Sequence, residues 1–328
     1  TLGIGYFPID WWLFSARAWW RIAPDLVILT EGERWPEHLW QAACRNVPVV
    51  CINARLSDRS FARLGRFRPA ARLVLGGITR LLSGSAQDEA RFRALGVPAE
   101  KITTSGNIKF DVAIVPLTTA ERAQLRREVG LPENDFVLLG SSTWPGEEEA
   151  LLGALQGARA AGLRCSLLIV PRHAERRAEI ERAVAATGLR FHLRSRGAAP
   201  ADVDVAVADT TGELRRLTQL ADLVFVGKSL APHTEGQTPI EAAALEKPIL
   251  FGPGMANFRV VSRDLIARGA AREVADAGAL GATVVELLRQ PTRRAELAAA
   301  AARWRRENAG AGERTLAVIR AELALLPL

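Results

Sequence analysis

The 328-residue chain is 48% apolar and 24% charged, the balance of a folded protein that is long enough for two domains. It has no uncharged apolar run of about twenty residues, which excludes a membrane-spanning helix within it. The net charge of +7 and the pI near 10.1 favour anionic partners. Nucleic acid is not expected among them, because no recognition-helix, zinc-finger or aromatic RNA-binding signature occurs. The three scattered cysteines lack metal-ligand spacing and indicate reduced thiols of a cytosolic protein.

The first forty residues hold six of the eight tryptophans. Two pairs are spaced eight apart, and we predict that they share one helical face near Arg17 and Arg21: Trp11, Trp12, Trp19 and Trp20. A helix of this composition suits an anionic membrane surface. The alternative is a helix that packs its tryptophans into the core of the first domain.

Apolar runs then alternate with helix-like segments, the pattern of a doubly wound α/β protein. In the first part we predict strands at residues 2–6, 26–29, 47–53, 81–85 and 102–106. This sheet lacks the opening βα unit of a Rossmann domain, so we expect it to be incomplete at its N-terminus. A turn-forming stretch at residues 116–119 feeds a charged helix at 120–129, which places the domain boundary near Val115.

The second part has the pattern of a complete Rossmann-like domain. Its predicted strands are residues 136–141, 166–170, 203–208, 223–226 and 248–252. The predicted domains are therefore residues 1–115 and 116–328. We expect the last helix, at about residues 313–326, to pack back on the first domain.

Polar clusters follow four predicted strands of the second part. They are residues 141–143, 171–173, 209–213 and the loop that begins at Gly227. Ligands of open α/β sheets bind at the carboxyl ends of the strands, so we expect these clusters to form one site.

The segment from Gly227 to Leu245 is the most informative of the four. We predict Thr238 as the N-cap of a short helix and Pro239 in its first turn. Free N–H groups at such a helix start favour a phosphate, and Glu241 suits two neighbouring ribose hydroxyls. A nucleotide-sugar pocket is one interpretation, and an ordinary capped βαβ unit is the other.

The order and spacing of several motifs resemble the 3-deoxy-D-manno-octulosonic acid (Kdo) transferase family over nearly the whole chain. The first part contributes residues 30–36 (TEGERWP), 53–57 (NARLS) and 106–111 (GNIKFD). The second contributes residues 140–143 (GSST), 170–173 (VPRH), 209–214 (DTTGEL) and the Gly227 segment. The resemblance implies a GT-B glycosyltransferase, in which two Rossmann-like domains face a cleft.

The resemblance also implies the reaction and its partners. Members of the family transfer Kdo, with inversion, from CMP-Kdo to a lipid A precursor in lipopolysaccharide core biosynthesis. They act at the cytoplasmic face of the bacterial inner membrane, as peripheral or anchored proteins. CMP carries one phosphate, so we expect a helix start and a cation to stabilise the leaving charge without a metal or other cofactor.

Individual site residues are carried over from the family motifs. Glu31 and Lys109 match the positions that stabilise the transition state. The residues expected to contact CMP are Pro171, Arg172, Thr211, Gly212, Glu213, Thr238, Pro239, Ile240 and Glu241. Three of them have structural alternatives. Arg172 could be a surface residue at a strand end, Lys109 could simply pair with Asp111, and Glu31, like Glu33, could be a helix-dipole partner before Trp35-Pro36.

The chain departs from the family pattern in three places. The general-base glutamate lies in a Gly-Glu motif that would precede Thr1, so we expect this chain to lack its base and any N-terminal membrane anchor. Gln237-Thr238 stands where many relatives have His-Asn, and Trp144 where many have histidine. Two alternatives therefore stay open: another GT-B enzyme that uses a UDP-sugar, and a non-catalytic nucleotide-binding fragment.

Overall fold

A computed structural model describes residues 3–325, which form two compact α/β units. Unit 1 comprises residues 1–111 and 308–328, and unit 2 comprises residues 112–307. The change between them lies at Asp111/Val112, four residues before the boundary predicted from the sequence. The predicted α/β class with two Rossmann-like parallel sheets is confirmed.

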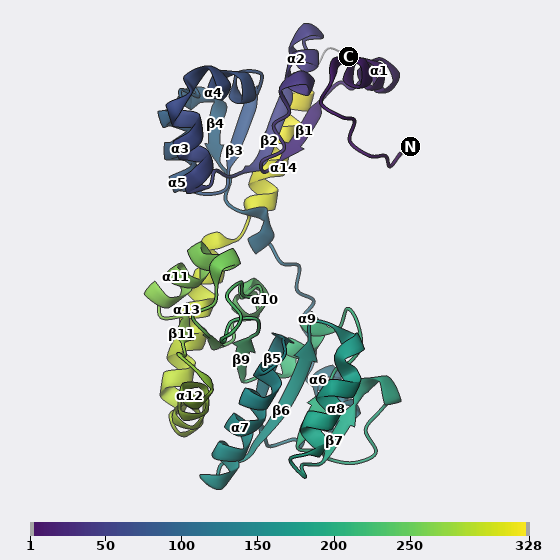
Figure 1. The fold of residues 1–328 in the computed structure, drawn as a ribbon, viewed down its shortest axis with the longest axis vertical. Helices are drawn as coiled ribbons and strands as arrows, with labels where there is room; N and C mark the ends of the chain where they lie inside the picture. The colour runs from purple at the N-terminus through teal and green to yellow at the C-terminus, as the bar shows by residue number, and fades with distance from the viewer. Residues whose placement is uncertain (1–2, 326–328) are drawn as a thin grey trace. The chain divides into compact units, whose positions relative to one another are not determined.

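Unit 1 is built on a four-stranded parallel sheet in the order β1-β2-β3-β4 (Figure 1). The strands are β1 (Val27–Thr30), β2 (Val49–Ala54), β3 (Arg80–Ser83) and β4 (Ile102–Thr104). The helices are α1 (Trp12–Ile22), α2 (Pro36–Cys44), α3 (Asp58–Arg66), α4 (Arg68–Leu75), α5 (Ala86–Ala94) and α14 (Ala311–Ala324). Two 3-10 turns complete it, η1 (Ala99–Lys101) and η2 (Ile108–Phe110).

The last helix, α14, is attached to unit 1 by polar contacts at both of its ends. Arg314 Nε donates to the Ser105 carbonyl at 2.8 Å near its start. Near its end, Glu322 Oε1 lies 2.6 Å from Arg80 Nε and is itself buried. These contacts join residues more than two hundred positions apart in the sequence.

Unit 2 is built on a seven-stranded parallel sheet in the order β11-β10-β9-β5-β6-β8-β7. The strands are β5 (Phe136–Thr143), β6 (Cys165–Pro171), β7 (Phe191–Leu193), β8 (Val205–Val207), β9 (Leu223–Val226), β10 (Ile249–Phe251) and β11 (Ala271–Glu273). The helices are α6 (Thr119–Glu128), α7 (Glu147–Ala160), α8 (Arg177–Ala185), α9 (Leu214–Leu217), α10 (Ile240–Ala244), α11 (Arg259–Ala267), α12 (Ala277–Arg289) and α13 (Pro291–Asn308). Four 3-10 turns join them, η3 (Ala174–Arg176), η4 (Arg194–Arg196), η5 (Thr218–Leu220) and η6 (Ala256–Phe258).

The strand order of unit 2 defines where a ligand can bind. On one side of β5 lie β6, β8 and the edge strand β7, and on the other side β9, β10 and β11 extend the sheet. The winding direction therefore reverses between β5 and β9. A crevice outside the carboxyl ends of the strands forms at such a reversal, and the polar clusters of the sequence lie there.

Two hydrophobic cores explain why the elements form. In unit 2, α7 and α12 pack together on the sheet, with Leu151, Leu155 and Val284 fully buried. In unit 1, strand residues such as Cys51 and Leu81 pack beneath helices, together with Phe92 of α5. Parallel strands covered on both faces bury nearly every side chain, which is why these strands are continuous apolar runs in the sequence.

Three predictions about elements are wrong. Residues 3–6 of the predicted first strand form no regular structure, and Leu2 lies outside the described residues. The short strands β7 and β11 were not predicted. The four tryptophans do not share one face, because Trp19 is buried and donates from Nε1 to His38 Nδ1 at 3.0 Å, whereas Trp20 is 77% exposed.

Candidate functional site

A cavity of about 840 Å³ opens at the carboxyl ends of the unit 2 strands. Its polar lining comes from the end of β5, from the loops after β6 and β8, from α9 and η5, and from the segment that leads into α10. The lining residues are Ala113, Val115, Leu117, Ser142, Arg172, Gly212, Leu214, Arg215, Arg216, Gln219, Gln237, Thr238 and Glu241. Its volume is that of a typical small-molecule site.

The cavity carries more positive than negative charge. Three arginines line it, Arg172, Arg215 and Arg216, against the single carboxylate of Glu241. Within residues 3–325, the guanidinium groups of Arg172 and Arg216 have no hydrogen bond or ion pair to a protein group, and both side chains are exposed. Arg216 also lies within electrostatic reach of the Glu121 and Glu213 carboxylates. Guanidinium groups suit the two-point binding of a phosphate.

Glu241 is the acidic member of the cavity. It is the second residue of α10, and its Oε1 lies 3.2 Å from Arg215 Nη2. The carboxylate remains partly exposed, at 24% of its side chain. Its other lone pairs are therefore open to two neighbouring hydroxyl donors.

The helix start differs from the prediction. Thr238 is not the N-cap, because α10 begins at Ile240 and Pro239 takes the cap position. Thr238 Oγ1 instead accepts from the Ile240 N–H at 3.3 Å. Since that N–H is already paired and α10 has only five residues, the positive charge of the cavity comes from arginine side chains more than from the helix end.

The structure brings together only part of the predicted set. Arg172, Gly212, Thr238 and Glu241 line the cavity. Pro171, Pro239 and Ile240 are buried in its supporting backbone, and Thr211 and Glu213 do not line it. Sequence reasoning missed Arg215, Arg216, Gln219 and the segment 113–117 as lining residues.

Glu213 is held by protein groups. Its carboxylate accepts from the Thr210 hydroxyl and lies 3.4 Å from Arg194 Nη2. Burial opposes ionisation, yet these two partners keep the pKa of Glu213 below its usual range. The geometry therefore suits support of the loop that carries Gly212.

A buried carboxylate fixes the loops around Ser142 and Lys228. Glu147, at the start of α7, is 1% exposed and accepts backbone N–H groups of Trp144, Lys228, Ser229 and Leu230 at 2.7–3.2 Å. Burial raises the pKa of Glu147, and the four N–H donors oppose that rise.

The two loops meet closely, and each has a residue in an unusual backbone conformation. A Cβ on Gly227 would lie 2.5 Å from the Ser142 carbonyl oxygen, so only glycine fits there. Ser142 and Lys228 both adopt positive φ, which is uncommon for such residues and concentrates at functional loops.

Unit 1 has a separate polar cluster at the carboxyl end of its own sheet. Glu31, just after β1, pairs with Lys109 of η2, with Nζ and Oε1 2.5 Å apart. Asn53 of β2 donates from Nδ2 to the same carboxylate at 3.1 Å. The Lys109 ammonium, opposed by partial burial, holds the pKa of Glu31 below its usual range. The alternative pairing of Lys109 with Asp111 is wrong, because Asp111 accepts from backbone N–H groups of Gly310 and Gly312.

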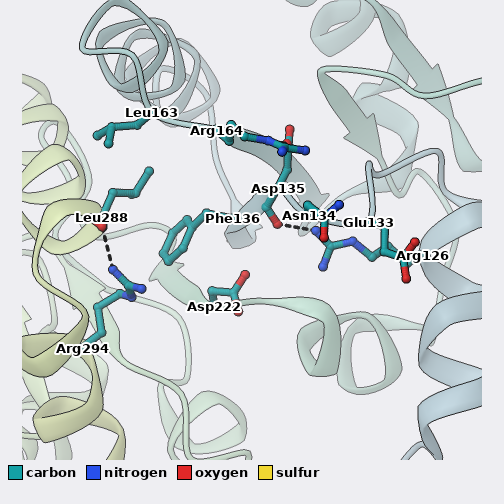
Figure 2. Close-up of a pocket in the computed structure, with 10 residues that line it drawn as sticks. All are labelled: Arg126, Glu133, Asn134, Asp135, Phe136, Leu163, Arg164, Asp222, Leu288 and Arg294. Carbon is teal, nitrogen blue, oxygen red and sulfur yellow. Dashed lines mark hydrogen bonds and ion pairs between the residues drawn. The ribbon is translucent and has the colours of Figure 1, made fainter.

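A second hollow of about 420 Å³ lies at the opposite, amino end of the unit 2 strands (Figure 2). Its arginines are engaged with the protein: Arg294 donates to the carbonyls of Leu287 and Leu288, and Arg126 to those of Pro132 and Asp135. Arg294 also stacks on Phe136 at 5.0 Å. These contacts tie helix ends to the sheet, and we assign the hollow a structural role.

Comparisons with known proteins agree with this geometry. The family model of 3-deoxy-D-manno-octulosonic-acid transferase (kdotransferase) matches residues 2–112. A 3-deoxy-D-manno-octulosonic acid transferase of Bordetella pertussis is 36% identical over 319 residues, covering 95% of this chain and 72% of that protein. The C-terminal CMP-Kdo binding domain of WaaA from Acinetobacter baumannii is 30% identical, with a TM-score of 0.52, over 56% of this chain and 95% of that one.

A more distant structure shares the fold alone. UDP-GlcNAc 2-epimerase from Neisseria meningitidis has a TM-score of 0.60 at 16% identity, over 94% of this chain and 78% of its own. The two parallel-sheet units, with a charged cavity where the winding of one sheet reverses, define a protein of the GT-B class.

Within that class the sequence likeness is decisive. The chain belongs to the 3-deoxy-D-manno-octulosonic acid transferase family and is a glycosyltransferase. The resemblance stated from the sequence motifs is confirmed.

Proposed function

We propose that unit 2 binds CMP-Kdo, with the CMP part in the cavity between Arg172 and Glu241. The observation that carries the proposal is that the exposed Arg172 and Arg216 side chains and the partly exposed Glu241 carboxylate line the same cavity. They match the two ends of a nucleotide monophosphate, an anionic phosphate and a ribose diol. The likeness to a domain described as CMP-Kdo binding supports the same donor.

Each cavity residue has a role in this proposal. Arg172 and Arg216 bind the phosphate by charge-assisted hydrogen bonds, and Glu241 accepts hydrogen bonds from the two ribose hydroxyls. The remaining predicted CMP residues position the backbone around the nucleotide: Pro171, Thr211, Gly212, Glu213, Thr238, Pro239 and Ile240. Thr238 contributes through the Ile240 N–H that it holds.

The reaction breaks the bond between the anomeric carbon of Kdo and the phosphate oxygen of CMP. The electron pair leaves with the phosphate, and the acceptor hydroxyl oxygen forms the new bond and gives its proton to a base. Attack opposite the leaving group inverts the anomeric configuration. Because charge builds on the phosphate as the bond breaks, Arg172 stabilises the transition state more than the bound substrate.

We infer that the arginines compensate the leaving phosphate in place of a divalent cation. We further propose that the unit 1 pair contributes to transition-state stabilisation, with Lys109 compensating negative charge and Glu31 compensating the positive charge of the transferred sugar. The 2.5 Å contact with Lys109 lowers the pKa of Glu31, which favours its ionised form.

We further propose a lipid A precursor as acceptor and a peripheral site of action at the cytoplasmic face of the inner membrane. No helix of the described residues is long and apolar enough to cross a bilayer. The surface of α1 supports a peripheral contact, because Trp12, Trp20, Arg17 and Arg21 are all exposed on it.

The proposal is tested by a transfer assay with CMP-Kdo and a lipid A precursor in vesicles, with and without EDTA. We expect slow Kdo transfer, because none of the described residues is assigned as the general base; EDTA leaves the rate unchanged, and Arg172→Ala lowers kcat/KM by about a hundredfold. Arg263→Ala is the matched control, because Arg263 is exposed on α11 and does not line the cavity. Transfer from a UDP-sugar but not from CMP-Kdo would overturn the donor assignment, and loss of transfer in EDTA would overturn the metal-free mechanism.

A further inference from the structure

The segment at residues 113–117 connects the domain boundary at Asp111/Val112 to helix α6. It forms no helix or strand, yet three of its residues line the unit 2 cavity: Ala113, Val115 and Leu117. A connecting segment is thus part of the wall of the proposed nucleotide site.

Two side chains hold this segment by its backbone. The Gln219 amide makes two contacts, accepting the Leu117 N–H at 2.8 Å and donating to the Val115 carbonyl at 3.1 Å. Arg215 donates from Nη1 to the Ala113 carbonyl at 3.1 Å. An irregular segment with exposed backbone needs such partners to keep one conformation.

Arg215 also connects the segment to the proposed ribose acceptor. Its second terminal nitrogen, Nη2, lies 3.2 Å from Glu241 Oε1, while Nη1 holds the Ala113 carbonyl. One planar guanidinium therefore joins Glu241 and the connecting segment. The rigid fork of arginine permits both contacts at once, which the single ammonium of lysine does not.

We propose that Arg215 is a positioning residue that couples nucleotide binding at Glu241 to the segment 113–117. The inference rests on the proposed function, since it takes Glu241 as the ribose acceptor. A nucleotide over Glu241 shields the Arg215–Glu241 pair from water and strengthens it. The fixed guanidinium then holds the Ala113 carbonyl more firmly. By linkage, loosening the segment weakens nucleotide binding by the same factor.

Hydrogen exchange read by mass spectrometry, with CMP as the probe, tests the coupling. We expect saturating CMP to slow amide exchange in residues 113–117 at least fivefold in the wild-type chain. Arg215→Lys keeps a positive charge beside Glu241 but cannot contact Glu241 and the Ala113 carbonyl at the same time. We therefore expect CMP to bind about tenfold more weakly and to leave amide exchange in residues 113–117 unchanged. Each variant is measured at the same fractional saturation, and Arg263→Ala serves as the control that retains the full response.

Gln219 gives an independent check, because its amide contacts the segment and not Glu241. Gln219→Glu can still accept the Leu117 N–H but cannot donate to the Val115 carbonyl. We expect it to speed exchange in the segment before CMP is added. Because Gln219 lines the cavity and the new carboxylate would repel the phosphate, the affinity is read from the uncharged Gln219→Ala, which we expect to bind CMP about threefold more weakly. Gln219→Glu keeps the shape of the side chain, whereas Gln219→Ala removes both contacts. If one variant does not fold, the other still tests the coupling.

The outcomes separate the coupling from the proposed function. If wild-type protein binds CMP but exchange in residues 113–117 does not change, the coupling is wrong and the CMP site stands. The coupling is also wrong if Arg215→Lys keeps both the affinity and the slowed exchange. If wild-type protein does not bind CMP at all, the proposed donor site fails and the coupling fails with it.

Discussion

At the scale of single residues, Glu31 and Lys109 are the unit 1 residues that the proposed mechanism uses. The two residues follow different strands, and the structure joins them directly. Their predicted roles in the transition state rest on this contact and on the lowered pKa of Glu31.

Lys109→Ala is expected to raise the pKa of Glu31 toward its ordinary value, because the ammonium is the main cause of its depression. We expect kcat to fall by about 10² to 10³, as when one group that stabilises a transition state is removed. The acid limb of the pH–rate profile then moves to higher pH, since Glu31 takes up its proton earlier as pH falls.

The measurement is a pH series of transfer rates, together with the titration of Glu31 followed by carbon NMR. Lys101→Ala is the matched control, because the Lys101 ammonium donates to the Ile78 carbonyl in the same unit and, within residues 3–325, pairs with no carboxylate. An unchanged kcat in Lys109→Ala would show that the pair has no part in the reaction.

At the scale of elements, Asp204 ties three parts of unit 2 together. It precedes β8, and its Oδ1 lies 2.9 Å from Arg190 Nη2, next to β7, and 2.7 Å from Arg159 Nη1 of α7. Although burial opposes ionisation, hydrogen bonds from Arg190 and Arg159 lower the pKa of Asp204 to about 2.

Asp204→Asn is expected to lower the free energy of unfolding by about 1–2 kcal/mol at pH 7, after allowance for the exposed Arg190. A depressed pKa gives stability that is present above the unfolded value near 3.9 and is lost as pH falls toward 2. The difference between wild type and variant should therefore shrink from pH 5 to pH 3. Thermal unfolding across this range measures it, with the exposed Asp202→Asn as control. A difference that does not depend on pH would contradict the assignment.

The sequence predicted most elements because parallel strands bury both faces and appear as apolar runs. It missed β7 and β11, whose three residues each include polar side chains such as His192 and Arg272. It placed the helix cap at Thr238 because a hydroxyl followed by proline is typical of a cap. In the structure Pro239 occupies the cap position, and α10 begins at Ile240.

The sequence could predict those residues of the candidate site that lie in the loops after strands. Arg172, Gly212, Thr238 and Glu241 follow three different strands, and the shared edge of a parallel sheet brings them into one cavity. Arg215 and Gln219 could not be found in this way. They come from the short α9–η5 segment, and only the tertiary structure shows that they hold residues 113–117.

At the scale of the whole molecule, the proposed membrane association assigns a role to the exposed aromatic surface of α1. Trp12→Ala combined with Trp20→Ala is expected to reduce binding to anionic vesicles about tenfold or more, because both indoles are exposed beside Arg17 and Arg21. Raising the salt concentration should weaken the wild-type interaction, since the arginine contribution is screened.

Vesicle sedimentation measures this partitioning, and Phe67→Ala, at an exposed aromatic residue away from α1, is the control. Absence of salt-sensitive binding by the wild-type chain would rule out the interfacial role of α1. In that case its tryptophans would serve packing, as Trp19 already does.

The central claim is that the unit 2 cavity is a CMP site, and a calorimetric titration with CMP and UDP, on wild type and on Arg172→Ala, tests it most directly. We predict that the wild-type chain binds CMP more tightly than UDP, and that Arg172→Ala weakens CMP binding at least tenfold while Arg263→Ala does not. Tighter binding of UDP, or CMP affinity that is unchanged in Arg172→Ala, would contradict the claim.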